Sequence, residues 1–120
     1  MKTPTISVLV VVGADRARSV LLLKSLAEQT ILDEMEIILV DIAPADAPEL
    51  IAPPGLMPRV LRHPGSFDWG AARAAAVHAA TTPLVAFLED HTVPDRNWAL
   101  EVRKAFDRSG KDVNSLLLFY

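Results

Sequence analysis

Two carboxylates and an imidazole follow one another at Glu89-Asp90-His91, directly after the apolar run 83–88. Continuous apolar runs of this kind are typical of buried parallel strands. In open α/β sheets, ligands bind in the crevice beyond the carboxyl ends of such strands. The oxygen and nitrogen donors of this cluster could hold a divalent metal ion, which could in turn hold an anion such as a diphosphate. The alternative is a polar loop that ends the strand and leads into a helix after Pro94.

Acidic residues also follow two other apolar runs. Asp15 comes shortly after the run 6–12, and Asp41 ends the run 36–40. A parallel sheet brings the carboxyl ends of its strands to one edge, where these acids and the Glu89-Asp90-His91 cluster would meet. Such acids also occur without any function, because Asp favours exposed turns. The sequence has no glycine-rich phosphate loop, so we expect a metal ion to neutralise much of the charge of any bound diphosphate.

The elements that position these residues are predicted from hydrophobic periodicity. Short apolar runs predict strands, and segments with helical spacing or high helix propensity predict helices. The expected order is strand 6–12, helix 19–30, strand 36–40, strand 59–62, helix 68–80, strand 83–88, a helix between Pro94 and Gly110, and strand 116–120. This order favours an α/β fold. We expect a mostly parallel sheet with helices on both faces and the run 6–12 at its centre.

Two local features refine this prediction. Ser19 is expected to cap the first helix, whose apolar face is formed by Leu22, Leu23 and Leu26. The segment 43–58 holds five of the nine prolines and can contain at most a short helix near 47–51.

Length and composition argue for one globular domain and against several classes of protein. The chain has 120 residues, enough for one domain with its own core. Its formal net charge is −3 and it has no stripe of lysine or arginine, which argues against nucleic acid as a partner. The lack of cysteine excludes a disulfide framework and a thiolate metal site. No apolar run reaches the roughly 18 residues of a transmembrane segment. Because no signal peptide is evident, we take the cytoplasm as the default location.

Several other side chains are weaker candidates. Arg73, one turn into the alanine-rich helix, could reach a ligand at the sheet edge or serve as a solubilising charge. Trp69 and Trp98 could stack on a base or sugar, although core packing is the expected role of Trp98. His63 is expected in a loop and His78 at the surface. No Ser-His-Asp or Cys-His arrangement can be assembled.

Four segments of the sequence match one family pattern in order. They are 5–12, an opening strand; 23–30, similar to L-x-S-L-x-x-Q-T; 36–41, similar to E-I-I-V-V-D; and 72–94, similar to A-R-N-x-G-x-x-x-A-x-G followed by a strand, F-L-D-x-D and a proline. The spacing from Arg73 to 87–89 fits this pattern without a gap. Together the segments span most of residues 5–106, and they resemble the start of a family 2 glycosyltransferase with the GT-A fold.

The resemblance implies a Rossmann-like GT-A fold. It also implies transfer of a sugar from a nucleotide-diphosphate donor to an acceptor hydroxyl, usually with Mg²⁺ or Mn²⁺. Asp41 would then help to bind the nucleobase, and Arg73 would lie near the base and the diphosphate. Asp46 matches the last acid of D-D-G-S-x-D, while Glu89 and His91 fall on the two acids of D-x-D. The implied nucleotide-sugar site consists of Asp15, Asp41, Asp46, Arg73, Glu89 and Asp90, with Asp90 and His91 as metal ligands.

This chain departs from the family pattern at several positions. Ile42-Ala43-Pro44 replaces D-G-S, and Ala74 and Ala76 replace the asparagine and glycine that follow the arginine. The stretch 12–15 replaces P-x-Y-N, whose aromatic residue would stack on the base. His91 stands in place of a metal-binding aspartate. Because imidazole suits Mn²⁺ better than Mg²⁺, we expect Mn²⁺ to be favoured and Mg²⁺ to be possible.

The catalytic base and the acceptor-binding region of this family follow a further strand, beyond residue 120. We therefore expect a single partial domain over 1–120, truncated before the acceptor half, with unknown catalytic residues and little activity alone. An exposed sheet edge would favour self-association.

Two other functions stay open. One is a non-catalytic nucleotide-binding or oligomerisation module. The other is an unrelated flavodoxin-like or receiver-like domain that binds Mg²⁺. Against the receiver class, Asp15 is a single acid and no lysine follows a strand.

Overall fold

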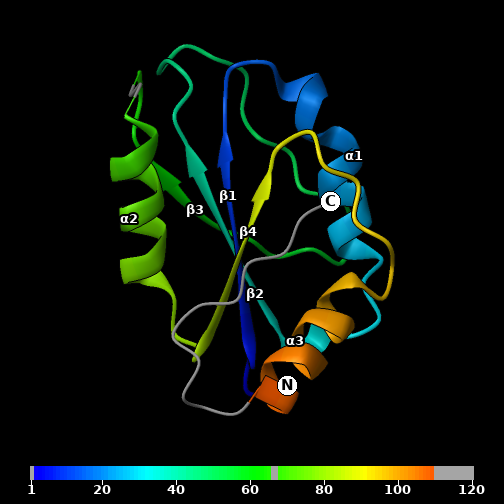
Figure 1. Ribbon diagram of the computed structural model, residues 1–120. Coiled ribbons are helices and arrows are strands. Elements are labelled where there is room, and N and C mark those ends of the chain that lie inside the picture. The colour runs from blue at the N-terminus through cyan, green and yellow to red at the C-terminus, as the bar shows by residue number, and fades with distance from the viewer. Residues whose placement is uncertain (1, 66–67, 110–120) are drawn as a thin grey trace.

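The computed structural model describes residues 2–65 and 68–109, and these form one parallel sheet with helices on both faces (Figure 1). The sheet has the order β3-β2-β1-β4. Its strands are β1 (Ile6–Val12), β2 (Met35–Asp41), β3 (Arg59–Arg62) and β4 (Leu84–Glu89). The helices are α1 (Arg16–Ala27), α2 (Trp69–Ala79) and α3 (Trp98–Ser109), with a 3₁₀ turn at Leu32–Glu34 before β2. The predicted α/β fold class is confirmed, and β1 lies between β2 and β4 as expected.

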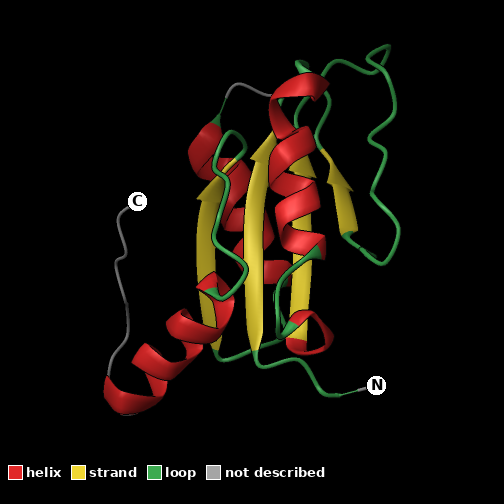
Figure 2. Ribbon diagram, turned by 90° about the vertical axis from the view of Figure 1, so that its right-hand side faces the viewer, coloured by secondary structure: helices red, strands yellow, loops and turns green. Residues whose placement is uncertain are grey.

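β1 separates two hydrophobic cores, because all seven of its residues are buried and successive side chains point to opposite faces. Its side chains Ile6, Val8, Val10 and Val12 join α1 and α3 in the larger core. Leu9 and Val11 face the smaller core with α2. Figure 2 shows α1 and α3 on one side of the sheet and α2 on the other. The sequence prediction that Leu22, Leu23 and Leu26 form the buried face of the first helix is confirmed.

The first helix starts earlier than predicted. It begins at Arg16, and Asp15 rather than Ser19 holds the N-cap position, although the Asp15 side chain makes no capping hydrogen bond. Ser19 is buried inside α1 and its hydroxyl donates to the carbonyl oxygen of Arg16 at 3.1 Å. A serine can bond back to the preceding turn in this way, so its presence did not mark a helix start. The helix also ends at Ala27 rather than at 30.

The start of the third helix also differs from the prediction. The third helix begins at Trp98, not at Pro94, because a turn intervenes in which Asp95 Oδ2 accepts from the backbone N–H of Asn97 at 3.0 Å. The proline-rich segment 43–58 contains no helix, which agrees with the prediction of at most a short one. The segment 59–62 does form β3, while strand 116–120 lies outside the described residues.

No helix within residues 2–65 and 68–109 has the length and apolar character needed to cross a bilayer.

Close packing of α2 on the sheet depends on two alanines, Ala72 and Ala76, which are both about 1% exposed. We predict that Ala76→Leu lowers the free energy of unfolding by about 2 kcal/mol, because the extra carbons overpack a filled core. Ala74 is exposed on the same helix, so Ala74→Leu should change stability by less than about 0.5 kcal/mol. Urea denaturation of both variants measures this. Equal stability of the two would contradict the packing of α2 described here.

Candidate functional site

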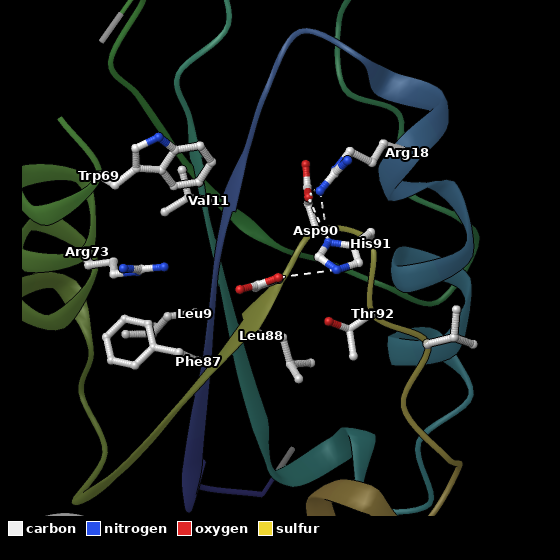
Figure 3. Close-up of a pocket in the computed structure, with 12 residues that line it drawn as sticks. Leu9, Val11, Arg18, Trp69, Arg73, Phe87, Leu88, Asp90, His91 and Thr92 are labelled. Carbon is white, nitrogen blue, oxygen red and sulfur yellow. Dashed lines mark hydrogen bonds and ion pairs between the residues drawn. The ribbon is translucent and has the colours of Figure 1, made fainter. Parts of the chain in front are cut away.

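A pocket of about 920 Å³ opens at the carboxyl end of β1 and β4 (Figure 3). Leu9, Val11 and Phe87 form an apolar floor on the face of the sheet that α2 covers. α2 packs against β1 and β2, which leaves this face of β4 open, and Phe87 is half exposed there. Trp69 and Arg73 line the pocket from α2, and the segment 88–93 lines it from the end of β4.

The Arg18 guanidinium binds the cluster that follows β4. Its Nε donates to Asp90 Oδ1 at 2.8 Å, and its Nη2 lies 3.0 Å from His91 Nδ1. His91 Nε2 is 3.2 Å from Glu89 Oε2. Asp90 is buried, while Arg18 is half exposed and lines the pocket (Figure 3). The hydrogen bond and the charge of Asp90 raise the pKa of Arg18, so the guanidinium is positively charged at any pH at which the protein folds.

A second arginine of α1 binds the carboxylate at the end of β2. Arg16 Nη1 and Nη2 donate to the two oxygens of Asp41 at 2.8 and 2.9 Å, which is the bidentate geometry of a strong ion pair. The backbone N–H of Ala43 donates to Asp41 Oδ1 at 3.1 Å. Arg62 Nη1 lies 3.4 Å from Asp41 Oδ2. Burial alone would raise the pKa of Asp41, but the hydrogen bonds from Arg16 and Ala43 and the positive charges outweigh it and hold this pKa below its usual range.

Asp41 is buried, with 1% of its side chain exposed, and does not line the pocket. Arg16 also donates to the carbonyl oxygens of Pro48 and Gly13. The pair therefore ties the loop after β1 to the loop after β2. This is a positioning role, and a direct contact of Asp41 with a nucleobase stays a prediction.

The parallel sheet brings the predicted acids to one edge, but only some of them reach the pocket. In the strand register, Val12 pairs with Asp41 and Val11 with Glu89, so both acids flank the end of β1. Of the predicted site residues, those that line the pocket are Arg73, Glu89, Asp90 and His91. Those that do not are Asp15, Asp41 and Asp46; the first and last are exposed. Trp98 is buried in the core, as expected.

The loop after His91 is held in place by Gln29, the glutamine of the segment that resembles L-x-S-L-x-x-Q-T. Its Nε2 donates to the carbonyl oxygens of Asp95 and Ser25 at 2.7 and 3.1 Å. Its Oε1 accepts from the backbone N–H of Ala99 at 3.0 Å, in the first turn of α3. The buried amide thus gives a partner to the Ala99 N–H, one of the first N–H groups of α3, which lack partners within the helix. Gln29 fixes the far end of the segment whose near end is Asp90 and His91.

Sequence reasoning missed the two arginines that bind the strand-end acids. Arg16 and Arg18 both precede the predicted helix 19–30, whereas in the structure they belong to the first turn of α1. Their position was itself a signal. Positive charge is unfavourable at the N-terminus of a helix, so two arginines there indicate nearby carboxylates. The acids that they bind are 25 and 72 residues away in the sequence, and the choice of partner could not be deduced without the fold.

A divalent metal ion finds few available donors at this edge. Within residues 2–65 and 68–109, no group of three or more histidine, aspartate or glutamate side chains is arranged to hold one. Asp90 and His91, the two predicted ligands, are both engaged by Arg18. Their present arrangement does not fit a bound metal, and the Mn²⁺ site stays a prediction.

Comparisons with known proteins identify the family of this chain and support its fold. The family model for glycosyl transferase family 2 matches residues 20–119. Two crystal structures of S. aureus TarS, one of them of its residues 1–349, superpose with a TM-score of 0.70 at 20% sequence identity. The superposition covers 87% of this chain but only 20% and 32% of the respective TarS chains. At this identity the TarS structures show the fold alone. No sequence among the curated proteins matches the chain.

The ion pair of Asp41 makes a prediction for stability. Asp41→Asn leaves Arg16 without its charged partner, and we expect it to lower the free energy of unfolding at pH 7 by about 3 kcal/mol. Because folding depresses the pKa of Asp41, its contribution is present above about pH 4 and is lost as the pH falls through the folded-state value. The difference between variant and wild type should therefore shrink as the pH falls below about 4, the ordinary pKa of an aspartate.

The matched control is Asp46→Asn, which removes an exposed carboxylate from the neighbouring turn. Its stability should stay within about 0.5 kcal/mol of wild type at every pH. Denaturant unfolding at neutral and acidic pH measures both variants. A constant difference between Asp41→Asn and wild type, or equal stability of the two variants at pH 7, would contradict the role given to Asp41.

Proposed function

Because the chain belongs to glycosyl transferase family 2, we propose that its pocket binds a nucleotide-diphosphate sugar, the donor for transfer of the sugar to an acceptor hydroxyl. The single observation that carries this proposal is the pocket beside β1 and β4, into which two arginines project from opposite helices (Figure 3). Its position fits the rule for open α/β sheets, in which ligands bind beyond the carboxyl ends of the strands. Its volume of about 920 Å³ lies within the range usual for small-molecule sites.

Arg73 supports an anionic ligand. It lies on α2, its guanidinium points into the pocket (Figure 3), and among the described residues no ion pair or hydrogen bond engages its side chain. It also occupies the arginine position of the family pattern. A guanidinium presents several N–H donors in one plane, which suits the oxygens of a phosphate group. Arg73 therefore binds the donor directly in this proposal.

The apolar part of the pocket suits the base or the sugar of such a donor. Trp69 is about half exposed on the rim, and its indole offers a flat surface for stacking. Leu9, Val11 and Phe87 supply the apolar floor. The chain lacks the aromatic residue of the P-x-Y-N pattern, and Trp69 is the aromatic side chain on α2 that could take its place.

Transfer of the sugar needs a group that accepts the proton of the acceptor hydroxyl. Glu89 and Asp90, the acids that line the described pocket, are bound to His91 and Arg18 respectively. We therefore assign the described residues to binding of the donor and give none of them the role of the base. The acceptor, the cytoplasmic location and self-association stay predictions from the sequence.

Ligand-induced stabilisation tests donor binding. We predict that UDP, GDP or dTDP raises the melting temperature, by roughly 10 °C for a ligand at about 100 times its Kd. Arg73→Ala should weaken binding by about tenfold or more, because one charge-assisted hydrogen-bonding group is lost. Thermal unfolding of wild type and variant, titrated with each nucleotide with and without divalent metal, measures both effects.

Arg108→Ala is the matched control, because it removes an exposed arginine near the end of α3, outside the pocket. It should bind nucleotide as wild type does. If no nucleotide stabilises the wild type, or if Arg108→Ala and Arg73→Ala weaken binding equally, the pocket is not a donor site. If a nucleotide does bind, release of free sugar from the corresponding nucleotide sugar would indicate an active site, and its absence a module that only binds the donor.

A further inference from the structure

The positively charged Arg18 of α1 lies at the end of β4, where the family pattern predicts a metal ion. We propose that the Arg18 guanidinium takes the place of the divalent cation and binds the donor diphosphate directly, so that nucleotide binding does not depend on metal. This inference rests on the proposed function, since it concerns how the same pocket holds the same ligand.

Contacts with Arg18 and Glu89 engage both ring nitrogens of His91. Arg18 only donates, so His91 Nδ1, 3.0 Å from Arg18 Nη2, must accept. The proton of the neutral ring then lies on Nε2, which faces Glu89 Oε2 at 3.2 Å. A ring with its proton on Nε2 fits both contacts, and both of its nitrogens are then engaged. A metal ion would have to displace Arg18 or remove the ring from Glu89.

Asp90 is engaged in the same way. Its Oδ1 accepts from Arg18 Nε at 2.8 Å, and its side chain is 9% exposed. A cation placed on this oxygen would stand against the guanidinium charge at close range, which is strongly repulsive at a buried site. Arg18 and a metal ion therefore compete for the same two residues, and the structure shows Arg18 bound to both.

Arg18 keeps hydrogen-bonding capacity for a ligand. A guanidinium has five N–H donors, and the contacts to Asp90 and His91 use one on Nε and one on Nη2. The side chain is 51% exposed and lines the pocket opposite Arg73 (Figure 3). Asp90 and His91 hold the guanidinium in a fixed position, so little side-chain freedom is lost when a phosphate binds.

The charges of the side chains that line the pocket nearly cancel. Among the lining residues, the charges of Arg18 and Arg73 are offset by those of Glu89 and Asp90. Attraction of a diphosphate therefore depends on directed hydrogen bonds from two guanidinium groups rather than on net charge.

The test compares nucleotide binding in chelator and in Mn²⁺ for the intact chain. Isothermal titration with UDP, GDP and dTDP should give wild-type Kd values that agree within about twofold between the two conditions. Arg18→Ala should lose about tenfold or more of its affinity in chelator. Because this variant frees Asp90 and His91, Mn²⁺ should restore part of the loss. Electron paramagnetic resonance should then detect Mn²⁺ bound to the variant and not to the wild type.

Lys24→Ala is the matched control, since it removes an exposed cation from the last turn of the same helix. It should bind nucleotide as wild type does in both conditions. The proposal is overturned if wild-type binding is at least tenfold weaker in chelator than in Mn²⁺, or if Arg18→Ala binds normally in chelator.

The comparison of wild-type binding with and without metal can be interpreted even if the Arg18→Ala variant unfolds or the proposed function is wrong. Arg18→Ala leaves Asp90 without its ionic partner and could unfold, but the wild-type comparison needs no variant and decides the question alone. A wild type that binds nucleotide only with metal overturns this inference and leaves the proposed function standing. A wild type that binds no nucleotide in either condition overturns both.

Discussion

Two buried carboxylates at one edge of the sheet require positive partners, and the structure around the pocket follows from how they obtain them. Asp41 ends β2 and Asp90 follows β4, on either side of the central strand. An unpaired buried charge is costly, so each acid must be matched. The first turn of α1 supplies both partners, Arg16 for Asp41 and Arg18 for Asp90. This turn has no acidic residue, although a helix N-terminus favours negative charge. The two ion pairs offset that unfavourable placement.

These ion pairs, with Gln29, position the elements that surround the ligand. Arg16 joins the loops after β1 and β2, and Arg18 joins α1 to the end of β4. Gln29 holds the loop after β4 against the start of α3. α2 lies on the opposite face and packs through alanines close to β1 and β2, which leaves the β4 side open. The pocket is the space between these fixed parts, with one arginine on each side.

The fold could be predicted from the sequence because its signals are local. Continuous apolar runs marked the strands, and the alanine-rich segment marked α2. Helix starts were less predictable, since the predicted cap Ser19 lies inside α1, which begins at Arg16. The candidate site was predicted in part. Arg73, Glu89, Asp90 and His91 share a pocket, whereas Asp41 is buried in an ion pair. Contacts across 25 and 72 residues leave no pattern that a single sequence can reveal.

The most direct test of the account is a crystal structure of the chain with a nucleoside diphosphate and Mn²⁺, in which anomalous scattering locates the metal. We predict diphosphate oxygens within hydrogen-bonding distance of Arg18, with Arg18 still bound to Asp90 and His91 and no anomalous peak at these residues. A Mn²⁺ ion on Asp90 and His91 that bridges the diphosphate, with Arg18 displaced, would contradict it. A nucleotide bound outside the pocket at the ends of β1 and β4 would also contradict it.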